Sequence, residues 1–344
     1  MGDTIPIKPP RIPAWVKQAV PVLVSIGILY YYFHDQDWPK FLAACGQADL
    51  RPALIAIFLP QLVMWFFSAL LVERTIRWFH GPFPFWTFFW IQGTSYILMF
   101  LNSALGGGGL LLYQQRKARI SWRKLLGIAL FRFGMVMWGM GFLMIPVTLA
   151  LHYYGLADKA RINLYVWWFI LIFPGVLFFF GSWFFWFRGT DYTGLGRIIV
   201  RDRESEFWTA FRLATRRQWV LTWAMMALPF VLMLVGFYFL NRAFAVNVPL
   251  SEFLVVAPLA LLVMDLPIAF GGFGTATLAW MTFFGHYGSP ENIAALSLFL
   301  PFARALCRGL IALVSLRPAL KDISSLVQAP EPESGKLALE VEEA

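Results

Sequence analysis

Charged side chains are scarce in this sequence. Asp, Glu, Lys and Arg together make up 14% of the 344 residues, whereas hydrophobic residues make up 59%. Because an ordinary soluble domain carries about 25% charged residues, this composition excludes a soluble globular protein. It predicts an all-α, polytopic integral membrane protein, with residues 1–328 forming one transmembrane domain and no folded soluble domain.

Cysteine and histidine are also rare, with two Cys and four His in the chain. Cys45 and Cys307 lie far apart, and neither these cysteines nor the histidines have the spacing of a disulfide framework or a metal site. The sequence also lacks a Ser, His and Asp arrangement, paired carboxylates and a phosphate-binding loop. We therefore expect no metal, no cofactor and no enzymatic activity.

Most of the charge that is present is basic, with 28 Lys and Arg against 19 Asp and Glu. These basic residues stand beside hydrophobic stretches, where cytoplasmic retention and anionic lipid headgroups explain them. We therefore expect membrane lipids as partners, with anionic headgroups, and no nucleic acid. Acidic residues dominate the last segment, 329–344, which is predicted to be a disordered tail.

Six apolar stretches are long enough to cross a bilayer. They cover residues 15–33, 52–72, 125–151, 164–187, 219–240 and 291–316. Two further apolar regions, 84–113 and 252–286, contain the glycine clusters 106–109 and 271–274. Because glycine breaks helices, each region is predicted to form a helix, a bend at the glycines and a second helix, as a re-entrant hairpin or a pair of spans.

The distribution of basic residues orients these spans. Residues 114–124 carry five basic residues and no acid, and residues 188–218 carry seven arginines against four acids, so both loops should be cytoplasmic. Region 84–113 then begins and ends on the cytoplasmic side, and region 252–286 begins and ends outside. With both termini cytoplasmic, 20 Lys and Arg fall inside and five outside.

The two glycine regions also match each other in sequence. Residues 99–109 align without gaps to residues 264–274 with six identities. Since the two regions enter from opposite sides, they would form an inverted repeat with halves of about 52–151 and 219–316. Secondary transporters are built in this way, with broken helices near the membrane midplane. Close helix packing or a tight bend explains the same glycines equally well.

Charged and polar side chains inside these apolar regions need partners. Arg132 and Arg304 lie in predicted spans, where a charge costs at least about 2.5–3.5 kcal/mol. They either hold a lipid phosphate or pair with Asp265 or with free carbonyl groups at the helix breaks. Asp265 either keeps an arginine permanently or exchanges it for an anionic headgroup. Asn102 either donates to a phosphate or caps the broken helix.

Residues 266–274, with the sequence Leu-Pro-Ile-Ala-Phe-Gly-Gly-Phe-Gly, are followed by the turn 285–288 and a span with Arg304. This pattern resembles the membrane region of the lysylphosphatidylglycerol synthase and flippase family. Residues 102–109, with Arg-Ile-Ser-Trp at 119–122 and Arg132 downstream, are similar to the family's first motif. The resemblance implies a lipid-handling membrane domain, which in the best-known members moves an aminoacylated phospholipid between leaflets.

The chain departs from this family's pattern in both motifs. The first lacks its usual proline near Ala104, Leu110 replaces a glutamate after the first glycines, and Thr277 stands where a glutamate often follows the second. About 28 residues follow Leu316, too few for the aminoacyltransferase domain of the full-length synthases. We therefore expect that a separate enzyme synthesises the lipid.

The expected function is that of a bacterial-type inner-membrane lipid transporter, or flippase-like protein, that handles a phospholipid, isoprenoid-lipid or glycolipid headgroup. The candidate substrate-binding residues are Arg132, Arg304, Asp265, Asn102, Gly106, Gly107, Gly109, Pro267, Gly271, Gly272 and Gly274. Two alternatives stay open. One is a membrane-embedded enzyme or an accessory subunit of lipid biosynthesis, and the other is a transporter of small solutes.

Overall fold

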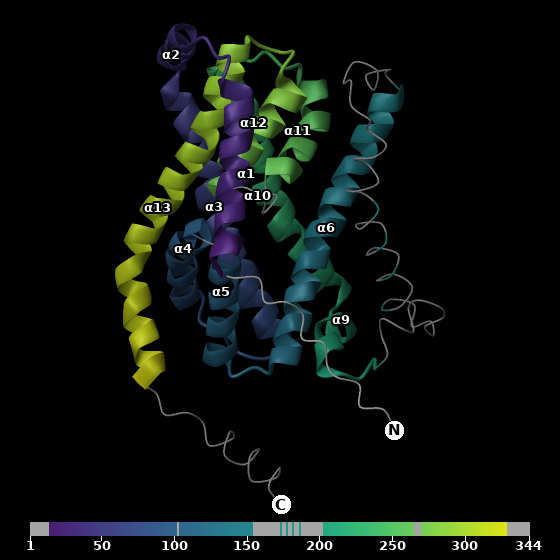
Figure 1. The fold of residues 1–344 in the computed structure, drawn as a ribbon. Coiled ribbons are helices and arrows are strands. Elements are labelled where there is room, and N and C mark those ends of the chain that lie inside the picture. Colours follow the sequence, from purple (N-terminus) through teal and green to yellow (C-terminus); the bar gives the residue numbers. More distant parts are fainter. Residues whose placement is uncertain are drawn as a thin grey trace, which may run out of the picture. The chain divides into compact units, whose positions relative to one another are not determined.

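The computed structural model describes residues 14–101, 103–153, 202–264 and 270–328, together with the single positions 173, 177, 181 and 186. Every regular element in these ranges is helical (Figure 1), so the all-α prediction is confirmed for the described residues. The elements are α1 (Ala14–Phe33), α2 (Trp38–Gln47), α3 (Leu50–Phe79), α4 (Phe85–Leu101), α5 (Ser103–Ala118), α6 (Trp122–Tyr153), η2 (Glu206–Trp208), α9 (Thr209–Leu213), α10 (Arg216–Ala243), α11 (Leu250–Met264), η3 (Phe270–Gly272), α12 (Phe273–Phe284) and α13 (Pro290–Gln328).

Three of these helices are long and apolar enough to cross a membrane. They are α3, α10 and the part of α13 from Pro290 to Ser325. They contain the predicted spans 52–72, 219–240 and 291–316, and they indicate a membrane protein.

The other three predicted spans have different outcomes. The span 15–33 lies within α1, in which Val22–Phe33 is a shorter apolar helix, and the span 125–151 lies within α6. The span 164–187 falls outside the described residues, apart from the four single positions. The count of six spans therefore stays a prediction, as does the acidic tail at 329–344, which also lies outside the described residues.

The chain groups into two compact units, each assembled from distant parts of the sequence. Unit 1 contains residues 1–57 and 236–305, and unit 2 contains residues 58–235 and 306–344. Helices α3, α10 and α13 each contribute to both units. Neither unit is one continuous stretch, so each depends on long-range packing between helices far apart in sequence.

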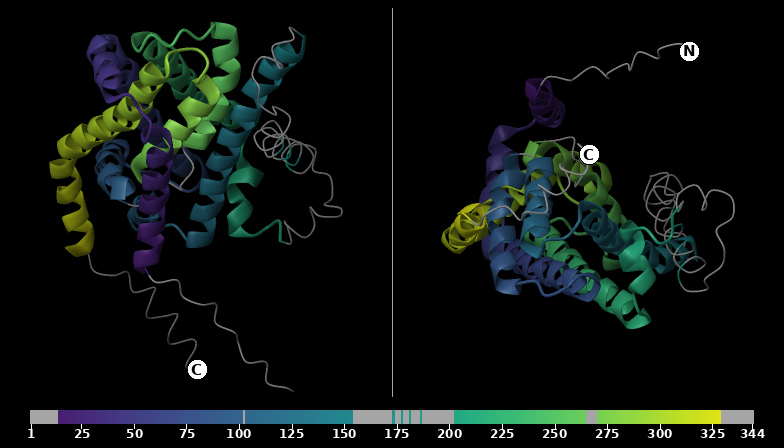
Figure 2. Two further views of the ribbon diagram at one scale, coloured as in Figure 1. Left: turned by 45° about the horizontal axis from the view of Figure 1, so that its top comes forward. Right: turned by 90° about the horizontal axis from the view of Figure 1, so that it is seen from below.

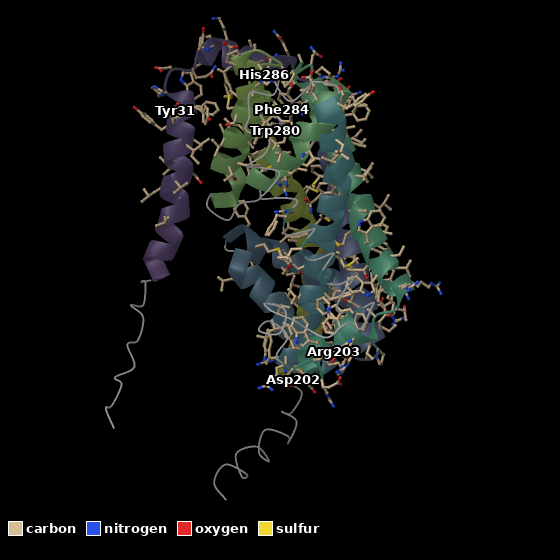
Figure 3. The ribbon with its side chains drawn as sticks, turned by 90° about the vertical axis from the view of Figure 1, so that its right-hand side faces the viewer. Tyr31, Asp202, Arg203, Trp280, Phe284 and His286 are labelled. Atoms are coloured by element: carbon tan, nitrogen blue, oxygen red, sulfur yellow. The ribbon has the colours of Figure 1, made fainter. Side chains whose placement is uncertain are left out.

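The core of unit 1 is aromatic. Trp280 and Phe284 lie one turn apart on α12 and are at most 1% exposed (Figure 3). The ring of Phe284 stacks on Phe253 of α11 with 5.9 Å between centroids, and Trp280 meets Phe237 of α10 edge to face at 5.7 Å. These buried pairs hold α10, α11 and α12 against one another.

One end of unit 1 collects loops that the charge pattern predicts to lie outside. The N–H of Asp49 donates to the carbonyl of Ala243 at 3.1 Å, and the N–H of Asn247 donates to the carbonyl of Tyr287 at 3.0 Å. The hydroxyl of Tyr287 donates to the carboxylate of Glu252. Burial, together with this bond, raises the pKa of Tyr287. The loops before α3, after α10 and after α12 therefore meet, as expected if they share one side of the membrane.

In unit 2, α4 and α5 form a hairpin (Figures 1 and 2) that packs on α3 and α13. Trp65 of α3 stacks on Phe89 of α4 with 3.9 Å between centroids, and its indole N–H donates to the carbonyl of Phe89 at 3.0 Å. Gly93 permits a close approach of α13, because a Cβ at this position would lie 2.1 Å from the hydroxyl oxygen of Ser315.

The basic loops before α6 and before α10 meet at one end of unit 2. The hydroxyl of Ser121 donates to the carboxylate of Glu206, and a Cβ on Gly127 would lie 1.7 Å from the carbonyl oxygen of Phe207. The segment that begins at Asp202, seen in Figure 3, therefore packs against the start of α6. Both loops were predicted to be cytoplasmic, and their contact places them on the same side of this unit.

Two more segments join the same end of unit 2. A ring nitrogen of His80, in the loop after α3, lies 2.9 Å from the carbonyl oxygen of Ala118. Near the end of α13, Asp322 accepts hydrogen bonds from Lys117 at 2.6 Å and from Tyr113 at 2.7 Å. The segments after α3, after α5 and at the end of α13 therefore share one end of the unit, together with their basic residues.

Candidate functional site

The second glycine motif interrupts a helix, as predicted. Helix α11 ends at Met264, the 3₁₀ turn η3 ends at Gly272, and α12 begins at Phe273 beside α11 (Figure 1). Gly271 and Gly272 have φ angles of 60° and 80°. This left-handed conformation suits glycine because it has no Cβ, and it allows the chain to turn immediately before α12.

Thr275 joins the two sides of this break. Its hydroxyl donates to the carbonyl of Met264 at 2.9 Å and lies 3.3 Å from the carbonyl oxygen of Gly272. The side chain is fully buried. Thr275 was not among the predicted site residues, although a threonine in the first turn after a helix break is a signal for such a bond. It satisfies one of the last carbonyl groups of α11, which lack partners within the helix because of their position.

Gly274 has a packing role at the start of α12. A Cβ at this position would lie 3.0 Å from the Cα of Ser25 and 3.3 Å from the side chain of Ile28, both on α1. The predicted alternative of close helix packing therefore explains this glycine.

Arg304 reaches the same break from α13. Its Nη1 atom donates to the sulfur of Met264, the last residue of α11, at 3.4 Å. Across the break, Gly272 is the N-cap of α12 and provides no side-chain hydrogen bond to the first amides of that helix. A guanidinium group and a helix N-terminus both favour an anion.

The first glycine motif differs from the prediction. The glycines 106–109 lie inside α5, which begins at Ser103, whereas α4 ends at Leu101, before these glycines. The prediction that these glycines bend the chain was therefore wrong. Each glycine disfavours a helix by about 1 kcal/mol relative to alanine, but a membrane offers no water to replace the helical hydrogen bonds.

The glycines of α5 have different surroundings. A Cβ on Gly106 would lie 2.8 Å from the backbone nitrogen of Met99, so this glycine allows α4 and α5 to pack closely. A Cβ on Gly109 would be in ordinary contact with Leu98 at 4.0 Å, and one on Gly107 or Gly108 would meet nothing within 4 Å. Only Gly106 is required by the packing of this hairpin.

Arg132 of α6 contacts the same helix, α5. Its Nη2 atom donates to Oε1 of Gln114 at 3.2 Å, and Gln114 is only 3% exposed. The Nη1 atom of Arg132 is buried and has no hydrogen-bond partner among the described residues. The partner of Arg132 is thus the neutral amide of Gln114, which was not among the predicted site residues. Among the described residues, no carboxylate lies within 4 Å of the Arg132 guanidinium group.

The structure sorts the predicted site residues into two groups. Arg304 and the glycines 271–274 belong to unit 1, whereas Arg132 and the glycines 106–109 belong to unit 2. Asn102, Asp265 and Pro267 lie outside the described residues. The predicted pairing of an arginine with Asp265 therefore stays a prediction.

No family model, curated protein or solved structure matches this chain.

Two substitutions in α5 separate packing from helix propensity. Gly106→Ala should destabilise the protein by about 1–3 kcal/mol, because its methyl group would overlap the backbone at Met99. Gly108→Ala, in open space, should leave stability unchanged or raise it by up to about 1 kcal/mol. Thermal unfolding in detergent measures both effects, and equal destabilisation by the two variants would contradict this assignment.

Loss of the Thr275 hydroxyl should loosen the break between α11 and α12. Thr275→Val is expected to destabilise the protein by about 1–2 kcal/mol, because the carbonyl of Met264 would lose a buried donor. The control is Thr222→Val, since Thr222 is equally buried but bonds only the carbonyl of Gln218 in its own helix. Hydrogen exchange in residues 270–276 should increase in the first variant only, and unchanged exchange there would show that Thr275 does not hold the break.

Proposed function

We propose that this chain is a membrane lipid transporter that binds a phosphate-bearing headgroup at the break between α11 and α12. The contact between Arg304 and Met264 carries the proposal, because it brings a guanidinium group of α13 to the end of α11. The N-terminus of α12 begins across the same break without a side-chain cap. Both features favour phosphate, which is the anion that lipids supply in a bilayer.

Exposure at the break supports binding of a ligand. Gly271 is exposed and Gly272 is partly exposed, whereas the residues that follow, from Gly274 to Thr277, are buried. The turn is thus reachable while the helix behind it is fixed. Such a combination of a fixed frame and an accessible backbone turn suits a binding site formed by a broken membrane helix.

The hydroxyl groups beside the break support binding rather than covalent chemistry. Thr275 donates to the carbonyl of Met264, and Thr277 donates to the carbonyl of Phe273 at 3.1 Å. Ser297 donates to the carbonyl of Ala294 at 2.8 Å. Each of these hydroxyl hydrogens is engaged by a backbone carbonyl, so these groups serve the helices and not a reaction.

The proposal includes an inverted arrangement of the hairpins α4–α5 and α11–α12 in the inner membrane, with cytoplasmic termini. Its support is the charge distribution, together with the meeting of Ser121 and Glu206 at the basic end of unit 2 and of Asn247 and Tyr287 at one end of unit 1. The motif resemblance to the lysylphosphatidylglycerol synthase and flippase family favours an anionic or aminoacylated phospholipid as the substrate.

The test is leaflet-resolved lipid transfer in proteoliposomes. The purified chain is reconstituted with tail-labelled phosphatidylglycerol, lysylphosphatidylglycerol or phosphatidylethanolamine, and a membrane-impermeant quencher reports the label that remains in the inner leaflet. We expect transfer of at least one lipid. The transfer rate of Arg304→Gln should be lower by a factor of about ten or more, and Arg304→Lys should recover part of the rate. Arg51→Gln, which removes an exposed arginine from the same unit, should change the rate by less than about twofold.

The absence of transfer for every lipid would contradict the proposal. Equal losses for Arg304→Gln and Arg51→Gln would show that general charge, and not the break, governs the rate. Thermal unfolding of each variant in detergent checks that a loss of transfer does not come from a loss of fold.

A further inference from the structure

Unit 2 contains a cavity of about 540 Å³ between the end of α3 and the start of α10. Polar and apolar side chains share its walls. The lining residues are Arg74, Trp78, Thr215, Arg217, Gln218, Leu221 and Met225. None of them belongs to α4, α5, α11 or α12, so the cavity is distinct from both glycine motifs. Its volume is typical of sites for small molecules or for the headgroup region of a lipid.

The lining residues follow helical spacing. Arg217, Leu221 and Met225 are four residues apart and therefore share one face of α10. Arg74 and Trp78 share one face of α3 in the same way. Along α10, the wall thus begins with a guanidinium group and continues with apolar side chains for two helical turns. This order matches a molecule with a charged head and a hydrocarbon chain.

Positive charge is in excess around the cavity. Arg216 and Arg217 occupy the first turn of α10, which contains no acid, although positive charge is unfavourable at a helix N-terminus. On α3, the carboxylate of Glu73 forms ion pairs with two arginines. One is Arg74, whose Nε atom lies 3.4 Å from Oε2 of Glu73, and the other is Arg77. These two turns therefore contain four arginines and one glutamate, and a bound anion would offset the imbalance.

The start of α10 is held in a fixed geometry. The N–H of Thr215 donates to Oε1 of Gln218 at 2.8 Å, and the N–H of Gln218 donates to the hydroxyl of Thr215 at 3.3 Å. This reciprocal pair is a capping box. It fixes two polar walls of the cavity, while the amides of Arg216 and Arg217 have no partner within the helix because of their position. Amides at this position complement the two arginine side chains in binding phosphate.

We propose that this cavity binds the phosphate of an anionic glycerophospholipid, with Arg74 and Arg217 on the phosphate and acyl chains along Leu221 and Met225. A lipid explains both halves of the wall, whereas free phosphate would leave the apolar half unused. Leu221 is 39% exposed, and Leu228, two turns further along the same membrane-length helix, is 54% exposed, so the apolar wall continues along a face that lipid chains can cover. The site does not depend on the proposed transport activity.

The experiment measures equilibrium binding to the full chain in detergent. The probes are dioctanoyl phosphatidylglycerol, dioctanoyl phosphatidylcholine and glycerol phosphate, which has no acyl chains. The double variant Arg74→Gln, Arg217→Gln should weaken phosphatidylglycerol binding by about tenfold or more. The matched control is Arg216→Gln, which removes one charge from the same turn of α10 but does not line the cavity, and it should change the affinity by less than about twofold.

Phosphatidylcholine and glycerol phosphate should each bind about tenfold more weakly than phosphatidylglycerol. Equal affinity for glycerol phosphate would assign the cavity to free phosphate, and equal affinity for phosphatidylcholine would remove the preference for anionic lipid. An effect of Arg216→Gln as large as that of the double variant would show that diffuse surface charge, and not the cavity, binds the lipid. Because binding is measured without transport, these outcomes are independent of the transfer assay with Arg304→Gln, and unfolding without lipid shows that the variants are folded.

Discussion

Hydrocarbon cannot donate or accept hydrogen bonds, and this constraint governs how the chain is built. A helix that stops within an apolar region must have its free backbone groups bonded by other parts of the protein. At the end of α11, Thr275 bonds the carbonyl of Met264, and Arg304 donates to the sulfur of the same residue. The break persists because it is bonded from two sides, and the polar atoms gathered there are also the ones that can meet an anionic headgroup.

The same constraint explains why the two glycine motifs differ. Their sequences align, yet Gly271 and Gly272 adopt left-handed angles while the glycines 106–109 remain helical. In α5 the helical hydrogen bonds are retained, and Gly106 allows close contact with α4 at Met99. Glycine propensity predicts a break in both places. The local packing that decides between a break and a close contact cannot be read from the motif alone.

Much of the fold follows from the apolar pattern. The length and hydropathy of α3, α10 and α13 make them candidates for membrane-spanning helices, and the sequence also predicts an interruption of the second apolar region at the glycines 271–274. The division into two units does not follow from the sequence, because it depends on contacts between distant segments. For the same reason Gln114 was missed: an amide at this position has many possible partners, and only the packing of α5 against α6 selects Arg132.

In the proposed inverted arrangement, the hairpins α4–α5 and α11–α12 open toward opposite sides of the membrane, and labelling of single cysteines tests this topology. On a background without the two native cysteines, cysteine replaces the exposed residues Ser121, Thr215, Asn247 and Ser289 in turn. A membrane-impermeant maleimide should label positions 121 and 215 from the cytoplasmic side and positions 247 and 289 from the outer side. Labelling of positions 121 and 215 from different sides, or of positions 121 and 247 from the same side, would contradict the inverted arrangement.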